Sequence, residues 1–257
     1  MMRMQPVRRH LLAGVLLAFG AGWAAVAGAA GVTISPVVLE IDSPRKAVAV
    51  TVTNNGDRPI TFQAEAMVWK QTNGIDQNEP TDELLVVPPI VEVPAKASQI
   101  FRVMLRSRAA SPVERTYRVM LDDITEEQGA SGSGQASVAF KLRHSLPVLI
   151  AASGQVVNAL RWKPCAPEAA PASSARPSAE ACVRLLNAGN RRVKVQALTL
   201  VGDGWQQVLS LKDGVNVLAG AEREWRVPLQ AGQAGALRGA QVRIAGGETL
   251  QAQTGGF

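Results

Sequence analysis

Short runs of alternating apolar and polar residues recur along this chain after residue 30, and turn residues separate them. The segment 47–53 (AVAVTVT) alternates without a break and ends at the turn sequence 54–57 (NNGD). The segment 60–70 (ITFQAEAMVWK) then alternates again. A period of two places every second side chain on the same face of a β-strand, whereas no long helical period follows residue 30. The chain is therefore predicted to be all-β.

The spacing of these runs predicts immunoglobulin-like β-sandwiches. About seven short strands fit within about 120 residues, with turns at the intervals that such a sandwich requires. The same alternating pattern returns between Gln155 and Ile244, where we expect a second, smaller β domain. In that domain 205–211 and 215–218 are expected to be two strands, with a turn at Asp213-Gly214 between them. A boundary near 151–154 gives an N-terminal domain over 30–150 and a C-terminal domain over 151–257.

Prolines mark two breaks in the first domain, and a polar stretch marks a loop. Pro36 interrupts a β-rich run and indicates an edge strand or a strand that switches between sheets. The pair Pro88-Pro89 is expected to break the pairing of 84–93 in its middle. Residues 71–83 are polar and are expected to form a loop.

The first 29 residues are expected to be a cleaved signal peptide. Three arginines within residues 3–9 precede the apolar run 11–25, and 27–29 (AGA) offers small residues for a signal peptidase. The run is short for a membrane span, and no later stretch is long and apolar enough to cross a bilayer. We therefore expect export, with no membrane insertion of the mature chain. Removing the three arginines from the 27 basic residues leaves 24 against 21 acidic ones.

Enzyme, metal and nucleic-acid functions find little support in the sequence. The mature chain has one histidine, His144, and no G-x-S-x-G elbow, P-loop or dinucleotide fingerprint. A zinc site needs three or four ligands, which His144 and two cysteines cannot supply. The basic residues are spread along strands and only one tyrosine is available for base stacking. No catalytic residue, cofactor, metal or nucleic-acid partner is expected.

The two cysteines, Cys165 and Cys182, are expected to form a disulfide. An even cysteine count in an exported chain favours pairing. The residues between them are rich in Ala, Pro and Ser, and closing a loop of this size stabilises a fold by roughly 3 kcal/mol in the chain-entropy model.

One alternating run has an unusual setting. The lead-in 129–134 (GASGSG) has no large side chain to pack, and the strand-like run that follows ends in 146–150 (LPVLI). Two interpretations remain open: the run is a core strand of the sandwich, or it is an edge strand that offers its apolar side chains to another chain. The apolar residues that stand two apart in it are Ala136, Val138, Phe140 and Leu142.

Taken together, these segments resemble the periplasmic pilus-assembly chaperones, and are most similar to the archaic, spore-coat-protein-type branch. The match covers 32–150 well and the second domain more loosely, through 186–190 (LNAGN) and 217–220 (VLAG). Its elements include a Thr-Asn-Asn-Gly turn before a long strand ending in Trp69, the Val87-Pro88-Pro89 segment, Gln99 with Arg102, Glu114 with Tyr117-Arg118, and a closing strand ending in Leu146-Pro147-Val148.

The resemblance implies two immunoglobulin-like domains joined at an angle, a periplasmic location and two protein partners. In this family the chaperone lends a strand to a pilus or fimbrial subunit that lacks its last strand, and delivers the subunit to an outer-membrane usher. The apolar run 136–142 takes the place of that donor strand. Its flexible Gly/Ser lead-in would let the donor segment order only on binding.

The resemblance also implies a basic anchor for the carboxylate at the C-terminus of the subunit. The family uses an arginine on the first strand, but that position falls on Val38, which cannot bind a carboxylate. Arg143, with Lys141 beside it, fits the second basic position of the family. Arg102 and Arg118 are expected on neighbouring strands, where a bidentate guanidinium could replace the missing charge.

Two other functions compete with the chaperone interpretation. A surface-exposed structural or adhesive β-sandwich protein of a pilus should carry an N-terminal donor extension, yet here the mature sequence enters a strand within a few residues. A secreted hydrolase is disfavoured by the single mature histidine.

Overall fold

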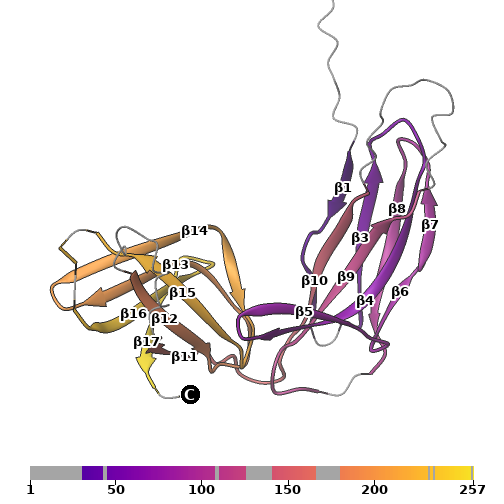
Figure 1. Cartoon of the computed structure of the whole chain (residues 1–257). Helices are drawn as coiled ribbons and strands as arrows, with labels where there is room; N and C mark the ends of the chain where they lie inside the picture. Colours follow the sequence, from indigo (N-terminus) through magenta and orange to yellow (C-terminus); the bar gives the residue numbers. More distant parts are fainter. Residues whose placement is uncertain are drawn as a thin grey trace, which may run out of the picture.

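Seventeen strands and no helix make up the part of the chain that the structure describes, in agreement with the predicted all-β class. The structure is a computed structural model, which describes residues 31–42, 45–107, 110–125, 141–165, 180–230, 232–233, 235–255 and 257. Figure 1 shows two β-sandwich domains set at an angle to each other. The expected signal peptide lies outside the described residues. Among those that are described, no helix is long and apolar enough to cross a membrane.

The N-terminal domain is a sandwich of two sheets. One sheet has four strands, in the order β1 (Val32–Ser35), β3 (Ala47–Asn54), β8 (Ser98–Leu105) and β6 (Leu84–Val87). The other has the order β2 (Leu39–Ile41), β10 (Arg143–Ile150), β9 (Arg115–Asp123), β4 (Ile60–Thr72) and β5 (Ile75–Pro80), and β7 (Ile90–Val93) also pairs with β4.

Pro36 and the pair Pro88-Pro89, which were expected to interrupt strands, lie where the chain passes from one sheet to the other. The chain before Pro36 pairs with β3 in the first sheet, and the chain after it pairs with β10 in the second. Likewise β6, before Pro88-Pro89, pairs with β8, whereas β7 pairs with β4. The two switches tie the sheets together along both flanks of the domain.

Alternation along the strands builds the core of this domain. In β3, Val50 and Val52 are fully buried, and the residues between and beside them are more exposed. Among the fully buried side chains of this core, Phe62 on β4 and Phe101 on β8 are the largest, and they come from opposite sheets. Burying each such side chain stabilises the fold by roughly 1.5–3 kcal/mol relative to leaving it exposed.

The C-terminal domain is one seven-stranded sheet that folds over a single core. Its strands, in sheet order, are β14 (Trp205–Val217), β13 (Val193–Gly202), β16 (Leu237–Ile244), β17 (Thr249–Thr254), β11 (Leu160–Pro164), β12 (Glu180–Asn187) and β15 (Glu222–Pro228).

Three expectations about individual strands need correction. Residues 71–83 are not a loop, because β4 runs on to Thr72 and β5 returns beside it. The hairpin turns at Asn73 and Gly74, whose φ angles are 52° and 77°. The segments 205–211 and 215–218 belong largely to one strand, β14, and Gly214 lies where the pairing with β13 jumps from Ser210 to Val215. Strand β17 was not expected.

The β4–β5 hairpin contacts the C-terminal domain through two residues of β4. Trp69, near the end of β4, is 2% exposed and belongs to the core of the C-terminal domain rather than to its own. Two residues later, the side-chain amide of Gln71 donates to the Asn216 carbonyl (2.9 Å) and accepts from the Leu218 backbone N–H (2.9 Å). Figure 1 shows this hairpin reaching to the junction of the two domains.

Candidate functional site

The N-terminal half of β10 has an open edge. On one side, β9 pairs with β10 over its full length, from Arg143 to Ile150. On the other side, β2 pairs only with Val148, Leu149 and Ile150. Within the described part of the chain, residues 143–147 therefore have no strand on that side. An edge of this kind presents unpaired backbone groups that a strand from another chain can use.

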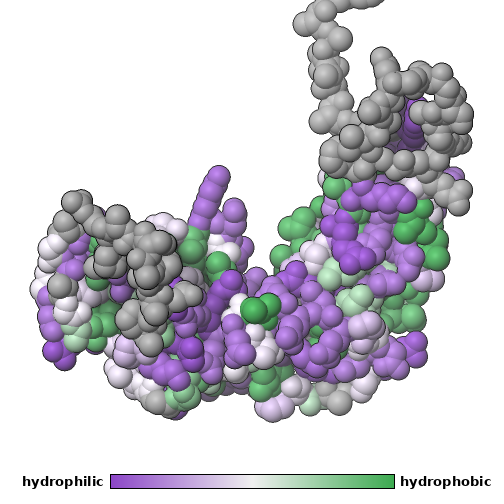
Figure 2. Space-filling model, in the orientation of Figure 1, coloured by the Kyte–Doolittle hydropathy of each residue, from purple (hydrophilic) through white to green (hydrophobic). Residues whose placement is uncertain are grey.

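Exposed apolar residues surround this edge. Leu142, immediately before β10, is 57% exposed. Val37 and Val38, immediately before β2, are also exposed. The expected first-strand position, Val38, thus lies beside the edge as an apolar side chain and not as a cation. Figure 2 shows hydrophobic residues gathered along both flanks of the N-terminal domain, with hydrophilic ones between them.

The apolar residues of the expected donor run, 136–142, alternate in step with the buried residues of β10. Leu146, Val148 and Ile150 lie two apart on β10 and are buried in the N-terminal core. Leu142 stands in the same phase, four residues before Leu146. His144 falls between them, and its Nε2 is buried without a hydrogen-bond partner among the described residues. The other three expected donor residues, Ala136, Val138 and Phe140, lie outside the described residues.

Arg143, the preferred anchor candidate, already forms an ion pair. Its guanidinium makes a bidentate contact with Asp122 on β9, with Nε–Oδ1 and Nη2–Oδ2 distances of 2.5 and 2.8 Å. The hydrogen bond and the charge of Asp122 raise the pKa of Arg143. The Arg143 side chain is nevertheless 64% exposed, so an incoming carboxylate can reach it. Lys141 is also exposed, just before the strand begins.

Arg118 lies on the same outer face of the sheet but is more enclosed. Its Nη1 donates to Ser145 Oγ on β10 (2.9 Å), and its Nη2 to Asp76 Oδ2 on β5 (2.8 Å). The guanidinium carbon lies 4.2 Å from the ring centroid of Trp69. Only 19% of the Arg118 side chain is exposed. Arg118 therefore connects the open half of β10 with the hairpin at the domain junction.

Arg102 does not join this group. It lies on β8, which pairs with β3 and β6 in the other sheet, and its side chain is exposed there. The expectation that Arg102 occupies a strand neighbouring β10 is wrong. Strand adjacency depends on which sheet a strand joins, and the local sequence pattern does not contain that information.

Sequence reasoning missed Ser145 and Asp76, which contact Arg118, and Gln71, which contacts Asp76. Asp76 was assigned to a loop because all residues of β5 are exposed and no alternation marks the strand. A usable signal was present in Asn73-Gly74, since both residues of a tight hairpin turn of this type have positive φ, which Asn and Gly tolerate.

A second polar cluster joins the domains. The Arg192 backbone N–H donates to Glu114 Oε2 (3.2 Å), and the Arg192 side chain lies 3.3 Å from Glu40. Burial raises the pKa of the Glu114 carboxyl, and the contacts with Arg192 oppose that shift. Hollows of about 300 and 250 Å³ lie on either side of Glu114, between the two domains.

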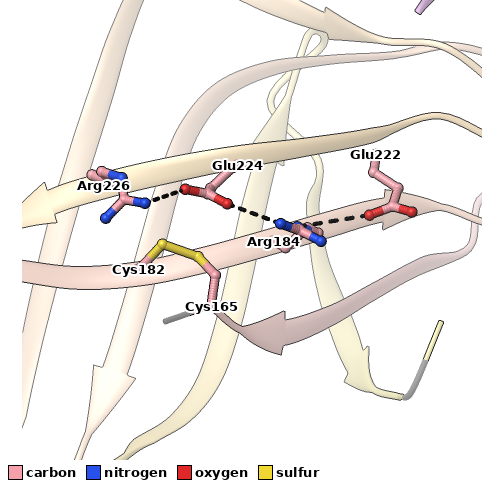
Figure 3. The surroundings of a disulfide bond; sticks show 6 residues. All are labelled: Cys165, Cys182, Arg184, Glu222, Glu224 and Arg226. Carbon is pink, nitrogen blue, oxygen red and sulfur yellow. Dashed lines mark hydrogen bonds and ion pairs between the residues drawn. A yellow bond between two sulfur atoms is a disulfide. The ribbon is translucent and has the colours of Figure 1, made fainter. Parts of the chain in front are cut away.

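The expected disulfide is present in the C-terminal domain. Cys165 and Cys182 are bonded, with their Cα atoms 5.1 Å apart. Figure 3 shows the bond beside a ladder of alternating charges on β12 and β15. Glu224 approaches the two sulfur atoms, but sulfurs bonded to each other are not thiolate ligands, so this group is not a metal site in the oxidised protein. The ladder consists of Arg184, Glu222, Glu224 and Arg226.

Comparison with solved structures shows a shared two-domain fold. A chain of the CsuC–CsuE chaperone–tip adhesion subunit pre-assembly complex of archaic chaperone-usher Csu pili from Acinetobacter baumannii is 17% identical, with a TM-score of 0.63, and the match covers 88% of this chain and 100% of that one. The class 5 fimbriae chaperone CfaA is 11% identical, with a TM-score of 0.58 and coverages of 88% and 100%.

A third structure, of the Salmonella enterica SafA pilin in complex with the SafB chaperone, matches at 13% identity and a TM-score of 0.55, over 87% of this chain and 96% of that one. No curated protein matches the sequence. Residues 31–154 match the family described as pili and flagellar-assembly chaperone, PapD N-terminal domain. The N-terminal domain of this chain is thus identified as a PapD N-terminal domain, the domain family described for pili and flagellar-assembly chaperones.

Proposed function

We propose that this protein is a periplasmic chaperone that binds a pilus or fimbrial subunit by donating a β-strand, and that it delivers the subunit to an outer-membrane usher. The proposal places it in the archaic branch of the family and assigns it no catalytic step, cofactor or metal. The observation that carries the proposal is the open edge of β10 at residues 143–147, with an apolar run immediately before it in the sequence.

The donor strand in this proposal is β10 extended toward its N-terminus. Backbone groups on the open edge pair with the subunit, and side chains in the phase of Leu142 fill its groove. The same phase holds Ala136, Val138 and Phe140. Each large apolar side chain that leaves water contributes roughly 1.5–3 kcal/mol before the costs of association are subtracted.

The anchor for the subunit's terminal carboxylate is Arg143 in this proposal, because it is the exposed guanidinium on the open half of β10. Lys141 supplies additional positive charge beside it. Arg118 is a weaker choice, because only 19% of its side chain is exposed. Arg102 is not assigned this role, because it lies on β8 in the other sheet.

The test is co-expression with candidate pilus subunits encoded near this gene. The expected result is a soluble one-to-one complex in the periplasmic fraction that is lost in Val138→Asp and Phe140→Asp. The matched control is Ser137→Asp, which places the same charge in the opposite phase of the run. If the Val138 and Phe140 variants fold and still retain the subunit, or if all three variants lose it equally, the donor assignment is wrong.

A further inference from the structure

A continuous line of polar contacts runs from the open edge of β10 toward the C-terminal domain. It begins at Ser145, in the unpaired half of the strand, whose hydroxyl accepts from Arg118 (2.9 Å). Arg118 in turn donates to Asp76 Oδ2 on β5 (2.8 Å). Three strands of the N-terminal domain, β10, β9 and β5, are thus joined on one face of the sheet.

The second half of the line crosses to the other domain. The remaining carboxylate oxygen of Asp76, Oδ1, accepts from Gln71 Nε2 (2.8 Å). The same amide nitrogen donates to the Asn216 carbonyl, and the Gln71 amide oxygen accepts from the Leu218 N–H. Gln71 therefore binds the C-terminal end of β14 and the residue that follows it with both ends of its side-chain amide. Asp76 holds that amide in its orientation.

Burial gives this line few alternative arrangements. Arg118 stacks on Trp69, which is itself packed in the core of the C-terminal domain. The Arg118 Nε is buried and has no hydrogen-bond partner among the described residues. A guanidinium held by stacking on one side and by two acceptors on the other cannot turn away without leaving buried donors unpaired, which costs free energy.

We propose that Asp76 and Gln71 are positioning residues that fix the C-terminal domain relative to the open edge of β10, and so couple occupancy of that edge to the orientation of the domains. The coupling to a subunit rests on the proposed function. A junction that is already ordered need not be ordered when the subunit binds, so the relay raises affinity by reducing that cost. By linkage, an occupied edge also restrains the junction.

The relay is tested first without any subunit. Spin labels are attached at Ala49→Cys and Lys212→Cys, exposed sites on β3 and β14, with the native disulfide intact. Double electron–electron resonance then reports the distribution of distances between the domains. Asp76→Ala and Gln71→Ala are expected to broaden the distribution. Glu79→Ala is the matched control, because it removes another β5 carboxylate that pairs with an exposed lysine, Lys70, on the same hairpin.

The second measurement is subunit affinity. Asp76→Ala is expected to weaken binding about five- to tenfold, at the lower end of the couplings usually found between two sites, and Glu79→Ala is expected to leave it unchanged. A distance distribution of Asp76→Ala that superimposes on that of Glu79→Ala overturns the relay. Failure of the wild-type chain to bind any subunit overturns the proposed function instead, and the distance measurement still decides the relay.

Discussion

Asn54 and Asn187 occupy equivalent positions in the two domains and share a pattern of side-chain hydrogen bonds. Each is fully buried at the end of a strand, β3 or β12. Each amide nitrogen donates to the carbonyl four residues ahead, that of Arg58 or Arg191, at 2.7 Å. Each amide oxygen accepts from the glycine N–H two residues ahead, at 2.9 or 3.0 Å. The two sandwiches thus build the same turn between corresponding strands.

We expect Asn54→Ala and Asn187→Ala each to destabilise the domain that contains it, by about 2–4 kcal/mol. Each substitution removes the partner of the two turn groups and also the donor to a buried carbonyl, that of Val93 or Val217. Urea unfolding followed by hydrogen exchange would assign the loss to one domain. Asn55→Ala is the control, since that exposed side chain makes a single contact with Thr33; an equal loss there would contradict the role of the buried amide.

The fold could be predicted from the sequence to the extent that one face of each strand is buried. Val50 and Val52 alternate with more exposed residues because their strand lies between core and solvent, and that alternation is visible in the sequence. Strand β5 gave no such signal because neither of its faces is buried. The division of β14 at Gly214 was a reasonable inference from a turn-like dipeptide, but a register shift in the pairing with β13 accommodates it.

The candidate site could be predicted only as far as the residues on β10. The apolar phase and the basic residues of that strand are contiguous in the sequence. Asp76 and Gln71, in contrast, approach Arg118 because a hairpin folds back toward the second domain, and side-chain contacts across 42 residues leave no local pattern. For the same reason Arg102 was assigned to the wrong surroundings.

Removal of the disulfide is expected to destabilise the C-terminal domain. The bond joins residues 17 apart in the sequence, so the chain-entropy model gives about 3 kcal/mol. We expect the double substitution Cys165→Ser and Cys182→Ser to lower the urea midpoint of this domain, while hydrogen exchange in β3 and β8 stays as in the wild type. An unchanged midpoint for the C-terminal domain would show that the bond does not constrain its unfolded chain.

Tyr117 is expected to lose its hydroxyl proton at a higher pH than a tyrosine in the unfolded chain, and to make the fold sensitive to alkaline pH. Burial, and then the hydrogen bond to Glu83 (2.5 Å), raise the pKa of its hydroxyl from 10.0 to about 12. The folded protein therefore holds this proton where the unfolded chain has lost it. The corresponding stability is complete below pH 10 and is lost as the pH rises from there through about 12.

Ultraviolet absorbance of tyrosinate measures this titration directly, because Tyr117 is the only tyrosine in the sequence. In Glu83→Gln the pKa should fall, but not to the value of the unfolded chain, since burial is the larger cause. In Tyr117→Phe the alkaline loss of stability between pH 10 and 12 should become smaller. A folded-state midpoint at the unfolded value would show that the hydroxyl is solvated.

Exchange of the charges of Arg143 and Asp122 separates the two roles that Arg143 can have. If it serves only its partner on β9, the double variant Arg143→Asp with Asp122→Arg restores the pair across the same two strands and should behave as the wild type. If it holds a subunit carboxylate, the exchange places a negative charge at the open edge and capture should be lost. We expect the second result, with the free protein still folded, because the Arg143 side chain is largely exposed. Urea unfolding of the free variants and co-purification with the subunit measure the two effects separately. The single substitution Arg143→Ala should also weaken capture of the subunit, without altering the fold. Retention of the subunit by the exchanged pair would remove Arg143 as the anchor, while the strand-donation hypothesis would still be tested by the Val138 and Phe140 variants.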